Sequence, residues 1–353
     1  MNICILGQYP PHVGGISTYT RMLEDVLKKK GHTVYVLTYS SDELSDDGYH
    51  FGVPFIDVSL FRGLSFSLFA IVKLVFLIKK YNIDLVHAHY IVPPGLVAVI
   101  SKFFTGVKTV VTVHGSDMNI LSKNKFVKPL LKFVLKHVDN VYYVSSLLKD
   151  MSEMLCDGIK DKGYVTKNVV DVNKFNGKCP SRKSDRVIVS FVGNLVKQKG
   201  LKYLLMAKKK ALTDYDLHIY GDGVEKDYLV SFVNENNIDN VYFKGVTNVS
   251  WKVMSCSDVI VLPSVSEGSS IVALEAMSSK KPLVASCTGN IGDVITSYEN
   301  GVLVPVGDVD CLRDAIDTLV DDKMLREWIG LNARRCVIEN FSVLDVPYIE
   351  WEK

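Results

Sequence analysis

The sequence of 353 residues lacks the charge excess of a nucleic-acid-binding protein and the cysteine pattern of a disulfide-rich or zinc-binding protein. Its 41 basic and 39 acidic residues leave a net charge of only +2, which argues against a polycationic nucleic-acid binder. The seven cysteines are scattered without a C-x-x-C pair, so we expect neither a disulfide framework nor a zinc site. A reducing cytoplasm is the simplest location for such a chain.

Export and membrane signals are also missing. The apolar run at the amino terminus covers only residues 3–6, which is too short for a secretory signal peptide. The longest apolar stretch, 64–78, contains Lys73 and is shorter than the ~20 residues that cross a bilayer, so we expect a core helix there. A hydrophobic share of 48% argues against disorder, and the length favours two domains.

The chain does contain a repeated alternation of β-branched and helical segments. This alternation predicts parallel strands joined by crossover helices, the doubly wound α/β class. Strands are expected at 3–6, 33–37, 84–87, 109–113, 187–192, 216–220, 241–244, 259–262 and 283–285. Helices are expected at 16–30, 64–80, 94–104, 199–211, 224–236, 269–279, 309–320 and 322–338.

A polar stretch rich in Asn, Gly, Lys and Ser interrupts this alternation near the middle of the chain. It predicts an N-terminal domain over 1–172, a linker over 173–185, a C-terminal domain over 186–338 and a final segment over 339–353. The final segment is too short for its pattern to show whether it crosses back to the first domain.

Positive charge is concentrated in one part of the first half. Residues 1–172 hold 19 basic and 15 acidic side chains, a net charge of +4. Five lysines and no acidic residue fall within 123–138, with apolar residues on another side of the same helical pattern. Two interpretations stay open: a surface helix with a solvated lysine face, or attachment to an anionic membrane surface.

Candidate site residues in the first half follow predicted strands, where ligands bind in open α/β sheets. Gly14 and Gly15 directly precede a helix and could approach an anion, although a tight turn explains them equally simply. The strand sequence IDLV is followed by His87, His89 and Tyr90, and TVVTV is followed by His114 and Asp117. Imidazoles there can bind hydroxyls or stabilise developing charge, while no metal-ligand spacing is present. His87, which has apolar neighbours, is better explained as a core histidine.

In the second half, the strand at 187–192 runs into a loop that contains Asn194 and Lys199. A lysine in such a loop can neutralise phosphate oxygens as a point charge. Gly221 marks another turn at a strand end, which is unspecific by itself.

The most informative stretch is VLPSVSEGSSIVALEAM at 261–277. It places Glu267 in a loop and Glu275 in the second turn of the following helix. The backbone N–H groups over 268–271 lie between them and would favour an anion such as a pyrophosphate. Taken singly, Glu275 is more often an exposed helix glutamate.

Together these residues resemble the retaining glycosyltransferases of family four. The motifs PPHVGGISTYT, VHAHY, VTVHGSD, VGNLVKQKG, IYGDG, LPSVSEGSSIVALEAM and NGVLVPVGD follow the order of that family over nearly the whole chain. The resemblance implies the GT-B fold, with two Rossmann-like doubly wound domains whose parallel sheets face an interdomain cleft. It implies sugar transfer from a UDP- or GDP-sugar to a glycan or lipid-linked acceptor, without a required cofactor or metal. Surface polysaccharide or glycolipid synthesis would fit, in the cytoplasm or on the inner face of the cell membrane.

The resemblance also implies roles for individual residues. His114 would contact the donor sugar, Lys199 the diphosphate, and Glu267 the sugar and phosphate; these are the predicted catalytic residues. Donor-binding positions would be Gly14, Gly15, Asn194, Gly221, Gly268, Ser269, Ser270, Ile271 and Glu275, the last of these on the ribose hydroxyls. The acceptor side would hold His12, His89, Tyr90 and Asp117.

Two departures from the family pattern have consequences. Asn194 stands where an arginine is usual, so Lys199 and the helix amides would carry more of the leaving group's charge. Lys280 stands where a glycine commonly ends the glutamate helix, and a left-handed lysine there costs ~1–2 kcal/mol. Two other functions stay open beside transfer: a nucleotide-sugar epimerase or hydrolase, and a catalytically weakened binding subunit.

Overall fold

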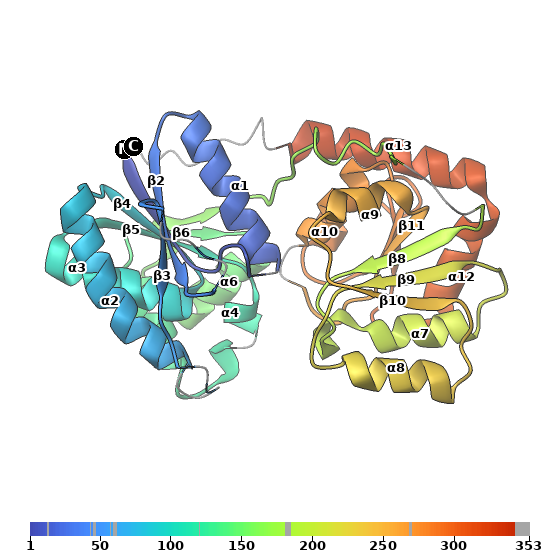
Figure 1. The fold of residues 1–353 in the computed structure, drawn as a ribbon, viewed down its shortest axis with the longest axis horizontal. Coiled ribbons are helices and arrows are strands. Elements are labelled where there is room, and N and C mark those ends of the chain that lie inside the picture. The colour runs from blue at the N-terminus through green and yellow to red at the C-terminus, as the bar shows by residue number, and fades with distance from the viewer. Residues whose placement is uncertain are drawn as a thin grey trace. The chain divides into compact units, whose positions relative to one another are not determined.

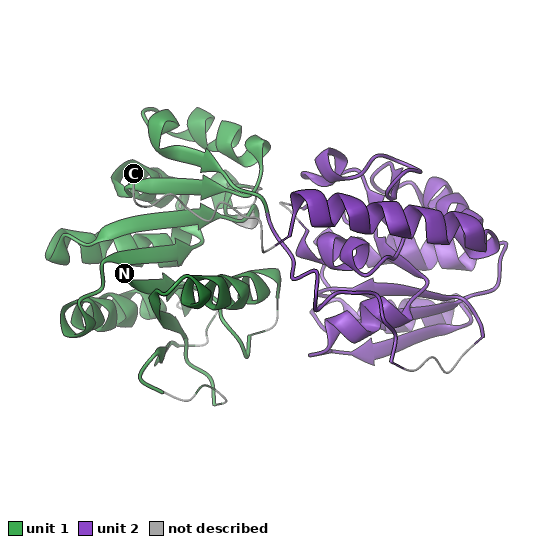
Figure 2. Cartoon of the chain, turned by 90° about the horizontal axis from the view of Figure 1, so that it is seen from above, with its two compact units in different colours: residues 1–167 green, residues 168–353 purple. Residues whose placement is uncertain are grey.

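A computed structural model of the chain describes residues 1–12, 14–42, 44, 47–56, 58, 62–119, 121–180, 185–267 and 270–342. The chain divides into two compact units, Met1–Lys167 (unit 1) and Asn168–Lys353 (unit 2), which Figure 2 shows in different colours. Each unit is a parallel sheet covered by helices, so the predicted doubly wound class is confirmed.

Unit 1 contains a seven-stranded sheet in the order β3-β2-β1-β4-β5-β6-β7, and all of its pairings are parallel. Its strands are β1 (Asn2–Leu6), β2 (Thr33–Tyr39), β3 (His50–Val53), β4 (Leu85–His89), β5 (Lys108–Val113), β6 (Asn140–Tyr143) and β7 (Gly163–Val165). The central strands are short apolar runs because side chains on both faces of the sheet are buried.

The helices of unit 1 lie on both faces of this sheet (Figure 1). They are α1 (Gly15–Lys29), α2 (Arg62–Tyr81), α3 (Leu96–Thr105), α4 (Ser116–Asn119), α5 (Lys128–His137) and α6 (Ser146–Leu155), with helical turns η1 (Ile91–Gly95), η2 (Leu121–Lys123) and η3 (Lys160–Lys162). Side chains of α2, α3 and α5 share one apolar cluster with alternate strand residues such as Cys4 and Leu6. The helix α1 buries Tyr19, Leu23 and Leu27 outside that cluster.

Unit 2 contains a six-stranded parallel sheet in the order β10-β9-β8-β11-β12-β13. Its strands are β8 (Ile188–Val192), β9 (Asp216–Tyr220), β10 (Val241–Gly245), β11 (Val259–Leu262), β12 (Leu283–Ser286) and β13 (Val302–Val304). Its helical elements are η4 (Lys197–Lys199), α7 (Leu201–Lys209), α8 (Lys226–Glu235), α9 (Ser250–Cys256), α10 (Ile271–Ser278), α11 (Ile291–Val294), α12 (Val309–Asp321) and α13 (Lys323–Asn340).

The alternation of side chains along β11 explains how unit 2 is packed. Val259 and Val261 join one apolar cluster with α7, α8 and α12, whereas Ile260 and Leu262 join another with α9, α10 and α13. A strand buried on both faces needs apolar residues at every position, which is why this run is continuous rather than alternating. At the end of the described chain, Ser342 forms a β-bridge with Val170; the rest of the predicted final segment, 343–353, lies outside the described residues.

Two expectations from the sequence were wrong. The strand at 84–87 extends to His89, so His89 does not follow the strand but lies within β4, with an exposure of 1%. His87 is fully buried in the same strand, as expected of a core histidine. A disulfide joins Cys179 to Cys256, whose Cα atoms lie 4.9 Å apart although 77 residues separate them in the chain. Their spacing gave no signal because the pair forms only through tertiary approach.

The apolar stretch at 64–78 forms most of α2, as expected. One face of this helix buries Phe66, Ala70 and Leu74, but the opposite face exposes large apolar side chains at every fourth position. These are Leu64, Leu68, Val72 and Phe76, with exposures of 59%, 61%, 73% and 59%. Among the described residues, no helix is both long and apolar enough to cross a membrane.

Replacing Lys280 with glycine should stabilise unit 2. Lys280 follows α10 with a φ of 58°, a left-handed conformation in which a Cβ crowds the backbone. We expect Lys280→Gly to raise the free energy of unfolding by about 1 kcal/mol, measured by urea denaturation. The neighbouring Lys281→Gly is the control and should not stabilise the chain, because Lys281 is not among the residues with positive φ. A stability gain as large in the control would contradict the explanation.

Candidate active site

The candidate residues of each unit cluster where the strand order reverses. In unit 1 the neighbours β1 and β4 lead to β2 on one side and β5 on the other. In unit 2 the neighbours β8 and β11 occupy the same position, between β9 and β12. The loops that follow two such neighbouring strands run in opposite directions and open a crevice at the carboxyl ends of the strands. Proteins of the α/β class bind ligands in this crevice.

Three imidazole rings gather at the ends of β4 and β5 in unit 1. His89 Nδ1 lies 3.1 Å from Nε2 of His114, which directly follows β5 and is half-buried. The ring of His87 lies 4.4 Å from that of His89, and its Nε2 contacts the hydroxyl of Thr112 at 2.7 Å. Burial lowers the pKa of His87 and of His114 to about 3, so the neutral rings are hydrogen-bonding groups rather than cations at neutral pH.

Two other predicted site residues of unit 1, Asp117 and Tyr90, have unusual environments. Asp117 is buried, and its Oδ1 accepts hydrogen bonds from the backbone N–H of Gly115 and Met118 at 2.9 and 3.2 Å. Burial raises the pKa of Asp117 to about 6 against these hydrogen bonds. Tyr90 has a φ of 95°, a conformation that costs a non-glycine residue of order 1–3 kcal/mol and is found mostly at functional sites.

The loop from β1 to α1 carries the predicted residues His12, Gly14 and Gly15. A Cβ placed on either glycine would meet no atom of the described chain within 4 Å, so the backbone is open to a ligand at this point. His12 contacts the carbonyl oxygen of Tyr39 through Nε2 at 3.3 Å, which holds the loop against the end of β2. These contacts restrain the loop and leave its glycine backbone accessible.

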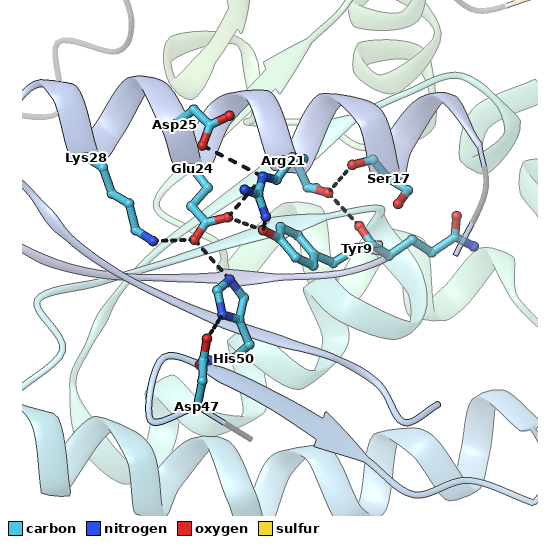
Figure 3. Close-up of polar contacts among 10 residues, drawn as sticks. Tyr9, Ser17, Arg21, Glu24, Asp25, Lys28, Asp47 and His50 are labelled. Atoms are coloured by element: carbon cyan, nitrogen blue, oxygen red, sulfur yellow. Dashed lines mark hydrogen bonds and ion pairs between the residues drawn. The ribbon is translucent and has the colours of Figure 1, made fainter. Parts of the chain in front are cut away.

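A buried carboxylate on α1 holds the beginning of the same loop (Figure 3). Glu24, whose side chain is 1% exposed, accepts hydrogen bonds from the hydroxyl of Tyr9 and from Lys28 Nζ at 2.6 Å, and contacts His50 Nε2 at 2.9 Å. Arg21 donates to the Tyr9 hydroxyl at 2.8 Å. Burial opposes ionisation of Glu24, but the hydrogen bonds from Lys28 and Tyr9 bring its pKa below the usual value.

In unit 2, Lys199 and Glu267 form an ion pair. Lys199 Nζ lies 2.5 Å from Glu267 Oε1, and Ser264 donates to the same oxygen at 2.9 Å. The side chains are 25% and 9% exposed. None of the described residues bonds Glu267 Oε2, and only one of the three ammonium N–H groups is used in the pair. The ion pair thus presents two donors and one acceptor to a ligand.

Close backbone packing places this pair at the strand ends. The backbone N–H of Val265 donates to the carbonyl of Gln198 at 2.8 Å, which joins the loop after β11 to the loop after β8. Gly200 has a φ of 65°, and a Cβ there would lie 2.0 Å from the carbonyl oxygen of Pro263. At Gly221 a Cβ would lie 1.9 Å from the carbonyl oxygen of Gly193, so this glycine is required by packing. Asn194 is exposed beside it.

The helix α10 begins directly after this loop. Ser270 is its N-cap, and the Ser270 hydroxyl accepts from the N–H of Ala273 at 3.3 Å, while Ile271 is the first helical residue. Glu275, in the second turn of α10, is only 5% exposed, whereas a glutamate on a helix is usually exposed to solvent. Gly268 and Ser269 lie outside the described residues.

The environment of Glu275 is unusual for a carboxyl group. Burial raises its pKa to about 8, and the charge of Lys174 only partly opposes that shift. No described residue donates a hydrogen bond to the carboxyl group. A ligand with hydroxyl donors would supply partners that the described residues do not.

Sequence reasoning did not find every residue of these clusters. Ser264 shares the carboxylate of Glu267, and Tyr19 packs its ring edge against His89 and His114, with centroids 5.4 and 5.1 Å away. Tyr19 lies on α1, far from both histidines in the chain, so no local pattern marks its contact. Ser264 lies three residues before Glu267, and the loop turn that connects them could have suggested it. Over the described ranges, no group of three or more His, Cys, Asp or Glu side chains is arranged to hold a metal ion.

Comparison with known proteins identifies the family. The family described as Glycosyltransferase Family 4 matches residues 13–174, and the one described as Glycosyl transferases group 1 matches residues 174–336. N-acetyl-alpha-D-glucosaminyl L-malate synthase of Bacillus anthracis is 27% identical over 94% of this chain and 91% of its own length. The UDP-Gal:alpha-D-GlcNAc-diphosphoundecaprenol alpha-1,3-galactosyltransferase of Escherichia coli is 28% identical over 86% of this chain and 83% of its own.

A solved structure shows the same fold. The Anabaena protein HepE in complex with UDP-glucose superimposes with a TM-score of 0.78 at 19% identity, covering 98% of this chain and 96% of that one. Two successive units, each built on a parallel sheet covered by helices, define the GT-B fold of this protein. The chain belongs to the group 1 glycosyltransferases of the family-four kind.

Proposed function

We propose that this glycosyltransferase moves a sugar from a UDP- or GDP-sugar to a glycan or lipid-linked acceptor with retention of configuration. The main support is the Lys199–Glu267 ion pair, which brings an ammonium group from the loop after β8 and a carboxylate from the loop after β11 together before the start of α10. The Escherichia coli relative uses UDP-Gal and a diphosphoundecaprenol acceptor by its description, and HepE binds UDP-glucose. Surface polysaccharide or glycolipid synthesis fits such an acceptor.

In this proposal, each residue has a defined task. Lys199 and the amides at the start of α10 bind the diphosphate, and Glu267 accepts a sugar hydroxyl through its second oxygen. Glu275 accepts the ribose hydroxyls, and His114 contacts the donor sugar near the reacting carbon. Gly14 and Gly15 offer accessible backbone to a phosphate group of the donor.

The chemistry needs stabilisation of separated charge. The bond between the anomeric carbon and the phosphate oxygen breaks through an oxocarbenium-like transition state, and the acceptor hydroxyl attacks from the same face. The departing phosphate oxygen takes the acceptor proton, so no separate protein base is required. Fixed donors aimed at the leaving group lower the barrier without reorganising during the reaction.

Donor binding and transfer can be tested in sequence. A thermal-shift screen against UDP, GDP and their sugars identifies the donor, because a ligand at 100 times its Kd adds ~2.7 kcal/mol of stability. Donor turnover is then measured with and without glycan and polyprenyl-diphosphate acceptors. Acceptor-dependent turnover with an α-linked product from an α-linked donor supports the proposal. Turnover without any acceptor supports a hydrolase or epimerase, and binding without turnover supports a binding subunit.

We also propose that unit 1 attaches to an anionic membrane surface through 123–138. Lys125, Lys128, Lys132 and Lys136 are exposed, while Leu131, Val134 and Leu135 of α5 are buried. The exposed apolar face of α2 adds side chains that could enter a lipid interface, and α2 packs against α3, which exposes Phe103 and Phe104. Peripheral attachment of this kind combines charge attraction with apolar burial.

Vesicle sedimentation tests this attachment. We expect binding to anionic phosphatidylglycerol vesicles at low salt, weakening as salt screens the charges. Lys132→Gln with Lys136→Gln should weaken binding roughly 30-fold, because each lysine near such a surface contributes ~1 kcal/mol. The matched control is Lys209→Gln with Lys252→Gln, two exposed lysines of unit 2. If the protein binds neutral and anionic vesicles equally, or does not bind at low salt, the membrane proposal is wrong and 123–138 is an ordinary surface segment.

A further inference from the structure

The pair His89–His114 is not explained by the predicted role of His89 at the acceptor side. The His89 side chain lies inside β4 and is 1% exposed, so it contacts its neighbours rather than solvent. Its Nδ1 lies 3.1 Å from Nε2 of His114. A Cβ on Gly7, at the end of β1, would come within 3.1 Å of the His89 Cβ, so this glycine makes room for the ring. Tyr19 covers both rings from α1.

Both imidazoles of the pair are neutral in the folded chain. Burial lowers the pKa of His89 well below its ordinary value, and burial lowers that of His114 to about 3. A neutral imidazole has one N–H and one bare nitrogen. The contact at 3.1 Å is therefore an N–H on one ring that donates to a lone pair on the other, and two arrangements are possible.

The second nitrogen of His89 distinguishes these arrangements. His89 Nε2 is buried and has no hydrogen-bond partner among the described residues. Buried N–H groups without an acceptor are rare in folded proteins, while an acceptor without a donor is tolerated more often. The favoured arrangement leaves Nε2 of His89 bare and places the proton of His89 on Nδ1.

We propose that His89 is a positioning residue that donates from Nδ1 to Nε2 of His114 and thereby keeps the proton of His114 on Nδ1. Because Nε2 of His114 then accepts, the remaining N–H of this ring is at Nδ1. No described residue bonds that nitrogen. The inference rests on the proposed function: there, His114 presents a hydrogen-bond donor, not an acceptor, to the donor sugar or to charge that develops beside it.

The tautomer can be measured without substrate. In full-length protein labelled with 15N-histidine, long-range 1H–15N correlation spectra distinguish a protonated from a bare ring nitrogen. A His114→Asn variant assigns the His114 signals. We expect His114 to carry its proton on Nδ1 and His89 to carry its own on Nδ1. In His89→Phe, which keeps a ring but removes both nitrogens, we expect the His114 proton to move at least partly to Nε2.

Kinetics then connect the tautomer to transfer. His89→Phe should lower kcat by about 10²-fold, the usual effect of losing one preorganised donor, with little change in the KM for the donor. His89→Asn keeps an amide nitrogen near the position of Nδ1 and should recover most of that loss. The matched control is His87→Asn, because His87 is equally buried in β4 but contacts Thr112 rather than His114.

The outcomes separate this inference from the proposed function. If His114 in the unchanged protein carries its proton on Nε2, or if His89→Phe leaves its tautomer unchanged, the positioning role is wrong even where transfer is observed. If the tautomer is as expected but His89→Phe transfers sugar at the normal rate, the role is also wrong. An expected tautomer together with no donor turnover in the unchanged protein would overturn the proposed function alone.

Discussion

Replacing Lys199 with alanine should lower the kcat of sugar transfer by about 10²–10³-fold. The ammonium group of Lys199 is the fixed positive charge of its loop, held 2.5 Å from Glu267, and Asn194 supplies none. Its loss removes charge stabilisation from the leaving diphosphate. Steady-state transfer with the donor identified by thermal shift measures the effect, and the donor Kd shows whether ground-state binding changes as well.

Glu267→Ala should cost a similar factor, because it removes both the group that orients Lys199 and a predicted acceptor for the sugar. The two changes should be far from additive in the double variant, since they act on one ion pair. Lys197→Ala is the matched control, an exposed lysine two residues earlier in the same helical turn. Near-normal turnover by either single variant, or an equal loss in the control, would contradict the assigned roles.

Replacing Glu275 with glutamine should stabilise the chain and weaken donor binding at the same time. Burial of its carboxyl raises the pKa of Glu275 from 4.5 to about 8. An acid whose pKa is raised on folding opposes folding as pH rises from its unfolded value to its folded value. We expect Glu275→Gln to match the parent near pH 4.5 and to exceed it by about 1–4 kcal/mol at pH 8.

Urea denaturation between pH 4.5 and pH 9 measures this difference, and isothermal titration measures donor affinity. Glu339→Gln is the control, an exposed glutamate on α13 that should give no pH-dependent gain. Because the proposed ribose contact needs an ionised carboxylate, donor affinity in the parent should rise with pH up to about 8. A parallel pH profile for both proteins would show that Glu275 ionises normally.

Local patterns predicted the central strands and long helices well. The runs at 259–262 and 216–220 are β11 and β9 as predicted. Apolar residues are continuous in β11, which is buried at every position, whereas burial alternates along β9. The strands β3, β6, β7 and β13 were not predicted, since each has only three or four residues. All but β6 also lie at an edge of their sheet, where less apolar surface is buried. Periodicity over so few residues carries little signal.

The candidate site was predicted in part. The stretch around Glu267 and Glu275 could be placed on a loop and the second turn of a helix because Ser270 is a typical N-cap and the apolar pattern follows it. The burial of Glu275 could not be predicted from the local pattern, since it depends on how α10 packs against elements distant in the chain, which include α13. The links Tyr9–Glu24 and His89–His114 likewise join residues from different elements.

The sequence by itself determined the two-unit parallel architecture, the loops that carry Lys199 and Glu267, and the left-handed end of α10 at Lys280. These features depend on residues close together in the chain, because the spacing of apolar residues and the residue types in turns determine local secondary structure. Only the tertiary structure decided that Lys199 pairs with Glu267, that His89 bonds His114, and that Cys179 meets Cys256. Such contacts arise when neighbouring strands bring distant loops to one edge of a sheet, and no local pattern records that approach.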